Sequence, residues 1–208
     1  MRVFLAVLLA AVLAKVNPLQ CETCSALGSA TCFGPIEKCA PDVTLCVKGL
    51  ETNIIGKVSS QNAFKRCLDP IKHKVCTREL SFRNSQFAIT LAANCCSTDK
   101  CNGESLPVTA PIDIIPNGYK CGECTSEQSA SGCTATQDVL CTGTHYYCGS
   151  FNGTGTRPGE PLKSYSYKGC ISKDACSTGL PNIGGTKAHT YQLTCTPANR
   201  VASRSVRV

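Results

Sequence analysis

The sequence lacks the features by which most enzymes are recognised. It has no Trp, one Met and three His, at His73, His145 and His189, and these occur in no zinc-protease or paired-ligand spacing. It contains no Gly-x-Ser-x-Gly motif for a nucleophile, and carboxylates such as Glu22 and Asp42 are scattered. We therefore expect no catalytic residues, no cofactor and no metal site, and a protein that is not an enzyme.

A long apolar segment is also missing. The run from Val3 to Ala14 follows a short basic start, Met1-Arg2, and as a helix would span only about 18 Å against about 30 Å of hydrocarbon. It ends in small residues that suit signal peptidase, so residues 1–14 are predicted to be a signal peptide, with cleavage as late as residue 20. The basic C-terminal tail, residues 198–208, lacks the apolar stretch of a lipid anchor. We expect a secreted, extracellular protein without a membrane anchor.

Cysteine is what the sequence has in abundance. The 208 residues include 18 Cys, 17 Gly and 11 Pro, a composition typical of small disulfide-rich secreted domains. Because such domains usually have fewer than about 100 residues, the length indicates two of them. The pairs Cys21-x-x-Cys24 and Cys121-x-x-Cys124 also suit zinc or thiol-redox sites, but a secreted chain with an even cysteine count favours disulfides.

The cysteines form two similar sets. The first set is Cys21, Cys24, Cys32, Cys39, Cys46, Cys67, Cys76, Cys95, Cys96 and Cys101, and the second is Cys121, Cys124, Cys133, Cys141, Cys148, Cys170, Cys176 and Cys195. Successive gaps in the two sets agree within three residues, and the offset between them returns to 100 at three matched positions. The chain is thus predicted to hold two tandem copies of one domain, at residues 19–105 and 119–197, joined by a Pro-containing linker at 106–118.

Apolar and polar residues alternate in the segments that lead into Cys95 and Cys195. This period of two, over residues 86–91 and 191–194, predicts half-buried strands. Residues 44–51 and 144–151 are likewise rich in β-forming residues, and no helix pattern of useful length occurs. An all-β class follows, with long central hairpins whose tips are predicted near 53–56 and 152–159.

The residues restrict the disulfide pairing in one place. Cys95 and Cys96 are adjacent and point to opposite faces of a strand, so they should have different partners, and Cys96 can reach Cys101 around a small loop. The second domain has Thr196 and Val201 at the matching positions, so both members of that pair are missing together. The remaining connectivity stays open, because even eight cysteines allow 105 pairings.

The spacing of the first set, ending in Cys95-Cys96-x(4)-Cys101-Asn102, resembles the lymphocyte-antigen-6/urokinase-receptor domain. The resemblance implies two tandem three-finger domains, the fold also used by snake neurotoxins. It implies the bridges Cys21–Cys46, Cys24–Cys32, Cys39–Cys67, Cys76–Cys95, Cys96–Cys101, Cys121–Cys148, Cys124–Cys133, Cys141–Cys170 and Cys176–Cys195. Because the second domain lacks the last bridge and the following Asn, its C-terminal loop is expected to be looser.

Two surface features point to partners or modification. A patch of basic residues is predicted that could steer an acidic partner or an anionic membrane surface, with an ordinary solvated face as the alternative. Its members are Lys65, Arg66, Lys72, His73, Lys74, Arg78 and Arg83. The sequon Asn152-Gly153-Thr154 predicts a glycan at Asn152, on a fingertip.

A closer resemblance concerns function. Two unequal three-finger domains joined by Pro116-Asn117-Gly118-Tyr119-x-Cys121 resemble both the gamma-type phospholipase A2 inhibitors of snake plasma and the sodefrin precursor-like factors of salamander courtship glands. Four features resemble the second group: residues 19–24, residues 49–53, the pair Cys124 and Cys133, and Ile171-Ser172-Lys173-Asp174-Ala175, which is similar to the sodefrin peptide core. This resemblance implies a protein pheromone that acts intact on a protein receptor. The alternatives are an inhibitor of secreted phospholipase A2 and an extracellular interaction module with another protein partner. Nucleic acid is not an expected partner.

Overall fold

The computed structural model describes residues 18–55, 58–68, 76, 79–107, 109, 111–129, 131–156, 159–183 and 185–202. The predicted signal peptide, the basic segment 72–74, Arg78 and residues 203–208 lie outside the described residues. In the part of the chain that is described, no helix has the length and apolar composition needed to cross a membrane.

Strands account for most of the first half of the chain. Their bounds are β1 Gln20–Glu22, β2 Cys24–Ala26, β3 Ile36–Lys38, β4 Leu45–Ile55, β5 Val58–Leu68, β6 Glu79–Arg83 and β7 Phe87–Cys96, followed by the short 3-10 helix η1 Cys101–Gly103. The predicted strand before Cys95 is therefore present as β7, and the run beginning at Thr44 forms β4.

The second half repeats this pattern with one addition. Its elements are β8 Pro116–Ser126, β9 Gln137–Thr142, β10 Tyr147–Thr156, β11 Lys163–Ile171, α2 Lys173–Thr178, β12 Asn182–Ile183, β13 Thr186–Pro197 and β14 Asn199–Arg200. The predicted all-β class is confirmed. Helix α2 was not expected, because six residues are too few to show helical periodicity. It begins where Ser172 Oγ accepts a hydrogen bond from Ala175 N, and it ends at Gly179 with φ 89°.

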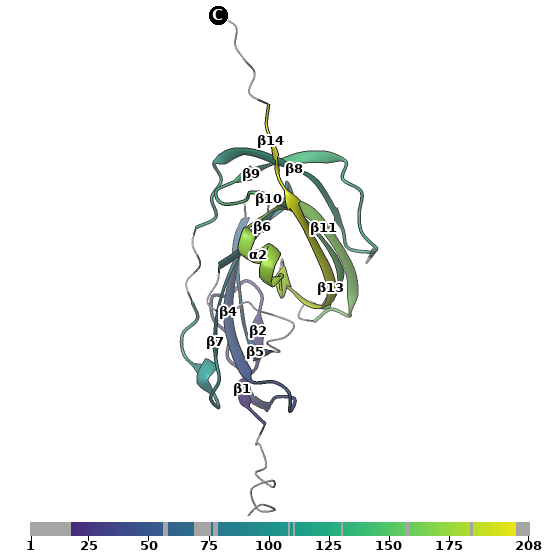
Figure 1. Cartoon of the computed structure of the whole chain (residues 1–208). Helices are drawn as coiled ribbons and strands as arrows, with labels where there is room; N and C mark the ends of the chain where they lie inside the picture. Colours follow the sequence, from purple (N-terminus) through teal and green to yellow (C-terminus); the bar gives the residue numbers. More distant parts are fainter. Residues whose placement is uncertain are drawn as a thin grey trace, which may run out of the picture.

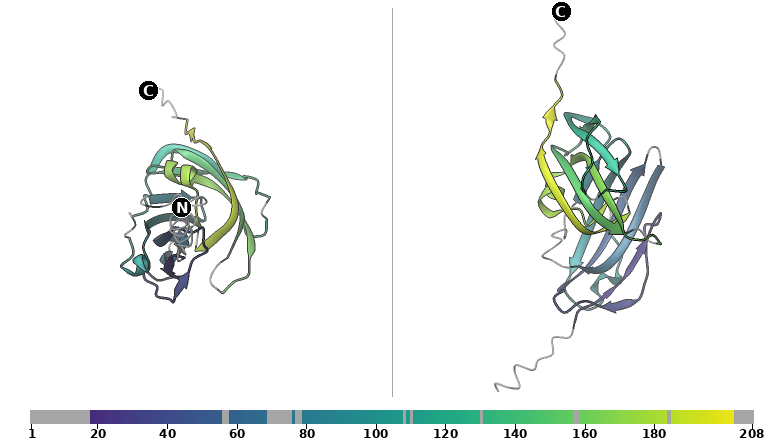
Figure 2. Two further views of the ribbon diagram at one scale, coloured as in Figure 1. Left: turned by 60° about the horizontal axis from the view of Figure 1, so that its bottom comes forward. Right: turned by 90° about the vertical axis from the view of Figure 1, so that its right-hand side faces the viewer.

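One sheet runs through both halves of the molecule. Its strand order is β12-β13-β10-β11-β6-β7-β4-β5-β2, and the halves join where β11 pairs with β6, at Cys170 with Arg83 and Ile171 with Phe82 (Figures 1 and 2). Gly169 permits this close approach, since a Cβ there would lie 2.2 Å from the Arg83 carbonyl oxygen. The tandem repeat thus forms one continuous structure, which the sequence pattern did not indicate.

The two halves also share one apolar core. The first half contributes side chains such as Phe64, Phe82 and Leu91, and the second contributes aromatic and aliphatic side chains of β10, β11 and the α2 region. Phe87 meets Tyr167 edge to face across the junction, with ring centroids 5.2 Å apart. Three smaller clusters of described residues around the disulfides lie outside this core, two in the first half and one in the second. Neither half therefore completes its apolar core alone.

The predicted fingertips begin too early in the sequence. Asn53 lies within β4, pairs with Ser60 of β5 and is 1% exposed, and Asn152 lies within β10 between Ser166 and Gln192. Asn53 Nδ2 donates to Glu51 Oε1 at 2.9 Å, so its polar group is satisfied inside the structure. Polar residues such as Asn53 favour turns in the sequence, whereas the strands of this hairpin extend to Ile55 and from Val58.

The C-terminal segment of the second domain, which was expected to be looser, is held by contacts of another kind. In the first half, Asn102 beside the Cys96–Cys101 bridge donates to the carbonyls of Glu22 and Val47 at 2.9 and 3.1 Å. The second half lacks these groups, but β14 pairs with β8 instead, and Val201 N donates to Gly118 O at 2.8 Å. Backbone hydrogen bonds therefore hold this segment in the second half, whereas the Cys96–Cys101 disulfide and the Asn102 side chain hold the corresponding segment in the first half.

Candidate binding cleft between the domains

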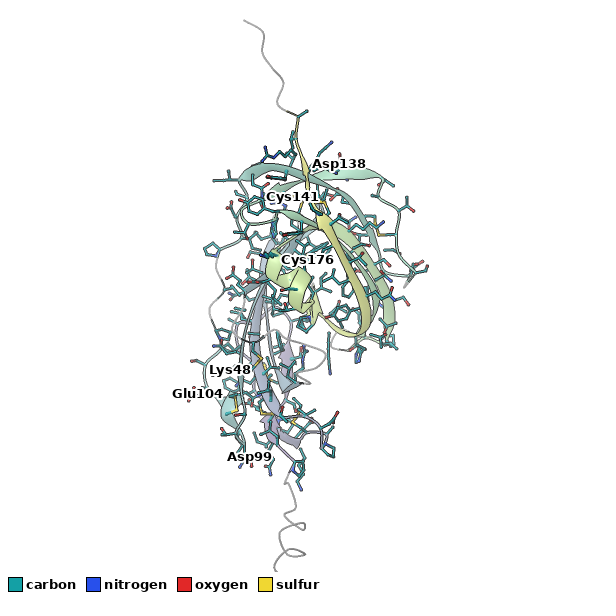
Figure 3. All side chains as sticks on the ribbon, viewed as in Figure 1. Lys48, Asp99, Glu104, Asp138, Cys141 and Cys176 are labelled. Atoms are coloured by element: carbon teal, nitrogen blue, oxygen red, sulfur yellow. A yellow bond between two sulfur atoms is a disulfide. The ribbon has the colours of Figure 1, made fainter. Side chains whose placement is uncertain are left out.

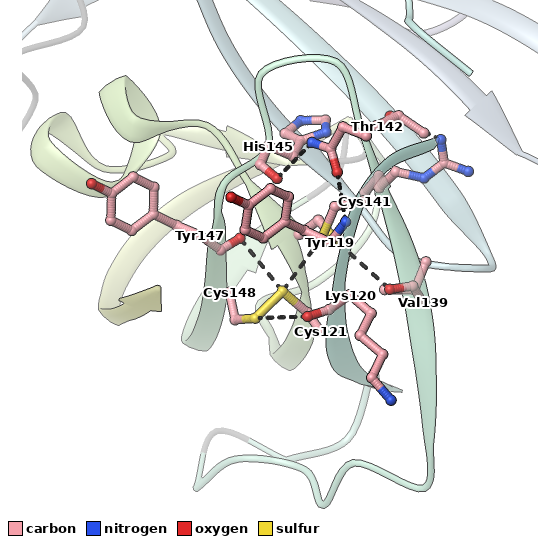
Figure 4. Close-up of a disulfide and its surroundings, with 12 residues drawn as sticks. Tyr119, Lys120, Cys121, Val139, Cys141, Thr142, His145, Tyr147 and Cys148 are labelled. Atoms are coloured by element: carbon pink, nitrogen blue, oxygen red, sulfur yellow. Dashed lines mark hydrogen bonds between the residues drawn. A yellow bond between two sulfur atoms is a disulfide. The ribbon is translucent and has the colours of Figure 1, made fainter. Parts of the chain in front are cut away.

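The described cysteines form nine disulfides, and these are the pairs that the resemblance implies. They are Cys21–Cys46, Cys24–Cys32, Cys39–Cys67, Cys76–Cys95, Cys96–Cys101, Cys121–Cys148, Cys124–Cys133, Cys141–Cys170 and Cys176–Cys195. The bridge Cys121–Cys148 lies against Cys141, with Cys121 Sγ and Cys141 Sγ 3.5 Å apart (Figure 4). Among the described residues, three cysteine sulfur atoms lie close together in each half: those of Cys21, Cys39 and Cys67, and those of Cys121, Cys141 and Cys170. All six are in disulfides, whereas cysteine binds metals as the free thiolate.

The described members of the predicted basic patch do not share a solvent face. Lys65 is 3% exposed, and its ammonium donates to Glu22 Oε2 at 2.9 Å and to Gly103 O at 3.1 Å. Arg83 is half-buried and donates to Thr142 Oγ1 of the other half at 3.1 Å. These residues do not form an ordinary solvated face either, because Lys65 and Arg83 form hydrogen bonds within the protein.

A cleft of about 480 Å³ opens where the two halves meet. Strands β5, β2 and β3 of the first half provide one side, and β10 and β13 of the second half provide the other. The lining residues are Thr23, Cys24, Ser25, Glu37, Lys65, Arg66, Cys67, Thr156, Gly185 and Lys187. Polar and charged side chains are among those that line it, and both halves contribute to its walls.

Arg66 is fixed at this junction by neutral groups of the second half. Its Nη1 donates to Asn182 Oδ1 at 3.0 Å, its Nη2 approaches Pro181 O at 3.5 Å, and the guanidinium carbon lies 4.5 Å from the centre of the Phe64 ring. Burial lowers the pKa of Arg66 to about 10, and attraction to Glu51 opposes that shift. The guanidinium therefore remains charged at neutral pH.

Two further basic groups of β13 lie near Arg66. The pKa of Lys187 is lowered by partial burial of its amine and then by repulsion from Arg66, while Glu37 opposes the shift. His189 Nε2 lies 2.8 Å from Thr156 Oγ1, and its pKa is lowered by partial burial and by repulsion from Lys187 and Arg66. These groups were not predicted as one set, because they meet only through the junction of the halves.

Residues 171–175 are part of the structural junction. Ile171 ends β11 with 0% exposure, Ala175 lies in α2 with 0% exposure, and Ser172 caps the helix. Ser172 N donates to Ser81 O at 3.0 Å, and Ser81 N donates to Ser172 Oγ at 3.1 Å. The helix, which includes Cys176, lies in front of the sheet in this view (Figures 1 and 3). The segment is thus held by both halves and is not a free loop.

His145 reinforces the same junction from the turn before β10. Its Nε2 lies 2.9 Å from Ser81 Oγ, and its side chain is near Thr142 in the close-up of the neighbouring disulfide (Figure 4). Burial lowers the pKa of His145 to about 4, and repulsion from Arg83 adds to the effect. His145 is therefore neutral at physiological pH.

The sequon residue Asn152 is half-buried on the outer face of the second half. A shallow depression of about 470 Å³ lies over it, lined in part by Ser131, Thr190 and Gln192. Thr154 Oγ1, the sequon hydroxyl, is 2.7 Å from Thr190 Oγ1. The side chain thus borders a polar surface and not a fingertip.

The fold defines a disulfide-bridged protein of two tandem three-finger domains. Residues 17–104 and 117–200 match the u-PAR/Ly-6 domain, so the chain belongs to the u-PAR/Ly-6 domain family. It is 25% identical over 195 residues to Phospholipase A2 inhibitor LNF1 of Lachesis muta muta, a match that covers 91% of this chain and 92% of that protein. It is 32% identical over 89 residues to Protein RoBo-1 of Rattus norvegicus, covering 43% of this chain and 34% of that protein. Mouse TEX101 is a similar solved structure, with 16% identity, a TM-score of 0.40, and coverage of 88% of this chain and 99% of that one.

Proposed function

We propose that the protein is a secreted, non-enzymatic binding protein that recognises another protein as an intact two-domain unit. The observation that carries this proposal is the shared core, in which apolar side chains from both halves pack together. A surface that is rigid before binding loses less conformational entropy in the complex. Nine disulfides and the continuous sheet provide that rigidity.

The finer proposal is that the partner is a receptor and the protein a courtship pheromone of the sodefrin precursor-like type. The resemblances at residues 19–24, 49–53 and 171–175 support it, as does the Cys124–Cys133 bridge. The burial of Ile171 and Ala175 supports an intact signal over an excised peptide. Cleavage after both Lys168 and Lys173 would not release the intervening peptide, because that peptide contains Cys170, which is bridged to Cys141.

A second candidate is binding and inhibition of a secreted phospholipase A2. The match to Phospholipase A2 inhibitor LNF1 favours it, because that match extends through both domains and nearly the full length of both chains. This candidate shares the binding mode of the first and differs only in the partner.

One experiment on the full-length, oxidised protein separates the candidates. Secreted phospholipase A2 is assayed on phospholipid vesicles with increasing protein, and tissue expression is mapped in the source animal. Inhibition at near-equimolar protein assigns the enzyme as partner and overturns the pheromone proposal. Expression confined to a courtship gland, an intact secreted chain and no inhibition support the pheromone. A free peptide covering residues 171–175, with little intact protein, contradicts both.

A further inference from the structure

We propose that the junction cleft binds an acidic segment of the protein partner, whose carboxylates meet Lys187, Arg66 and His189. This inference rests on the proposed function in assuming a protein partner, and it adds the place and the chemistry of recognition. The cleft of about 480 Å³ has room for a few side chains, and both halves line it.

Three of the basic groups at the cleft, Arg66, Lys187 and His189, have no acidic hydrogen-bond partner among the described residues. Arg66 donates to an amide oxygen and a backbone carbonyl, and His189 contacts a threonine hydroxyl. Among the described residues, no carboxylate lies within ion-pair distance of Lys187. Lys65 differs, because Glu22 already neutralises it. Arg66, Lys187 and His189 are therefore the groups whose interaction with an added carboxylate is favourable.

The mutual effects of these groups support the same conclusion. Arg66 disfavours the charge on Lys187, and both disfavour protonation of His189. A carboxylate in the cleft relieves this repulsion and favours all three protonated forms. Because neutral groups of β12 and the turn before it hold Arg66, its guanidinium is oriented before the partner arrives.

Glu37 sets the selectivity of the cleft. It is exposed on β3, lines the cleft, and is the acidic group that favours the charge on Lys187. An incoming carboxylate competes with Glu37 for Lys187 and is repelled by it. Removing the Glu37 charge is therefore expected to strengthen binding of an acidic segment, whereas a purely structural role for Glu37 predicts no gain.

The test measures binding of a fluorescent hexaglutamate peptide to the full-length oxidised protein at low ionic strength. Lys187→Gln is expected to weaken binding about five-fold, and Glu37→Gln to tighten it about three-fold, as for single charges near a protein surface. Lys173→Gln is the matched control, because Lys173 is exposed on α2, lies outside the cleft lining and changes net charge equally. Lys187 is also exposed, so its variant should fold, and thermal unfolding checks this.

Opposite effects of Lys187→Gln and Glu37→Gln, with no effect of Lys173→Gln, support the proposal. Equal losses for Lys187→Gln and Lys173→Gln show attraction to net charge alone and overturn it. Competition by millimolar inorganic phosphate as strong as by unlabelled peptide also overturns it, since the site then takes any small anion. If Lys187→Gln and Glu37→Gln leave peptide binding unchanged while the protein still binds phospholipase or a receptor, the cleft proposal is refuted and the proposed function is not.

Discussion

Acidification is expected to destabilise the domain junction through His145. His145 is 7% exposed, its Nε2 contacts Ser81 Oγ, and the backbone of Thr142 favours its protonated form. The charged groups that act on it are Arg83, which opposes protonation, and Asp113, which favours it more weakly. Protonating this ring in the folded protein places a second positive charge near Arg83 in a largely dry junction.

The sign and size of the effect follow from the pKa. The value is about 4 in the folded protein against 6.5 for an ordinary His, so between these values the unfolded chain binds a proton that the folded chain does not. Stability from this group is fully present above pH 6.5 and is lost as pH falls toward 4. The difference between the two pKa values corresponds to about 3 kcal/mol. That is a large fraction of the stability of a typical domain.

Urea unfolding from pH 7.5 to 4.0, with disulfides intact, measures this loss. Carboxylates also titrate in the lower part of the range, so the test is the difference between the native protein and His145→Gln. His189→Gln is the comparison: the pKa of His189 is also lowered, but His189 is exposed, so its effect should be smaller than that of His145→Gln. The native protein should lose up to about 1.4 kcal/mol per pH unit more than His145→Gln does between pH 6.5 and 4.5. Parallel profiles for the two proteins would refute the reasoning.

Three further outcomes are expected. Glu22→Gln should lower the free energy of unfolding by about 3 kcal/mol, because it leaves the ammonium of Lys65 buried without its counterion; an unchanged urea midpoint contradicts this. The secreted protein should carry a glycan at Asn152, so that glycosidase treatment lowers its mass. Asn152→Gln should abolish this mass shift and Thr154→Ser should preserve it, and a native protein of unmodified mass contradicts the prediction. Alkylation of the unreduced protein should label none of the 18 cysteines, and any labelled residue would break the closed disulfide set.

The sequence carried more information about the local structure than about the assembly. Cysteine spacing repeats because each domain needs the same bridges, so the repeat was visible without coordinates. Alternation before Cys95 indicated a strand, which is present as β7, but its prediction of a half-buried strand is wrong, because residues 88–93 are all buried and both faces are covered. The pairing of β6 with β11 left no such trace, since it depends on a close backbone approach at Gly169 and on surfaces that belong to different repeats. The cleft could not be predicted for the same reason.

Polar residues gave the misleading signals. Polar side chains of this kind are usually exposed to solvent, but those of Lys65, Asn53 and Arg83 form hydrogen bonds inside the structure. Their partners are either distant in sequence or two residues away in the same strand. A single sequence does not show such partners. Asn102, by contrast, follows the last cysteine of the first domain in a recognisable motif, and the structure shows what it does there: its amide joins β1 to β4.

The shared core explains how the second domain tolerates the missing bridge. A domain of this size buries little apolar surface alone, and small domains of this kind usually depend on disulfides. Here Phe151, Tyr165 and Tyr167 of the second half pack in one cluster with Leu80 and Phe82 of the first. Burial against a neighbour supplies stabilisation that an isolated domain would need from another cross-link, and β14 holds the C-terminal segment in place by backbone hydrogen bonds. The second domain is therefore stable as part of the pair, and the cleft that the pair creates comes from the same contacts that stabilise it.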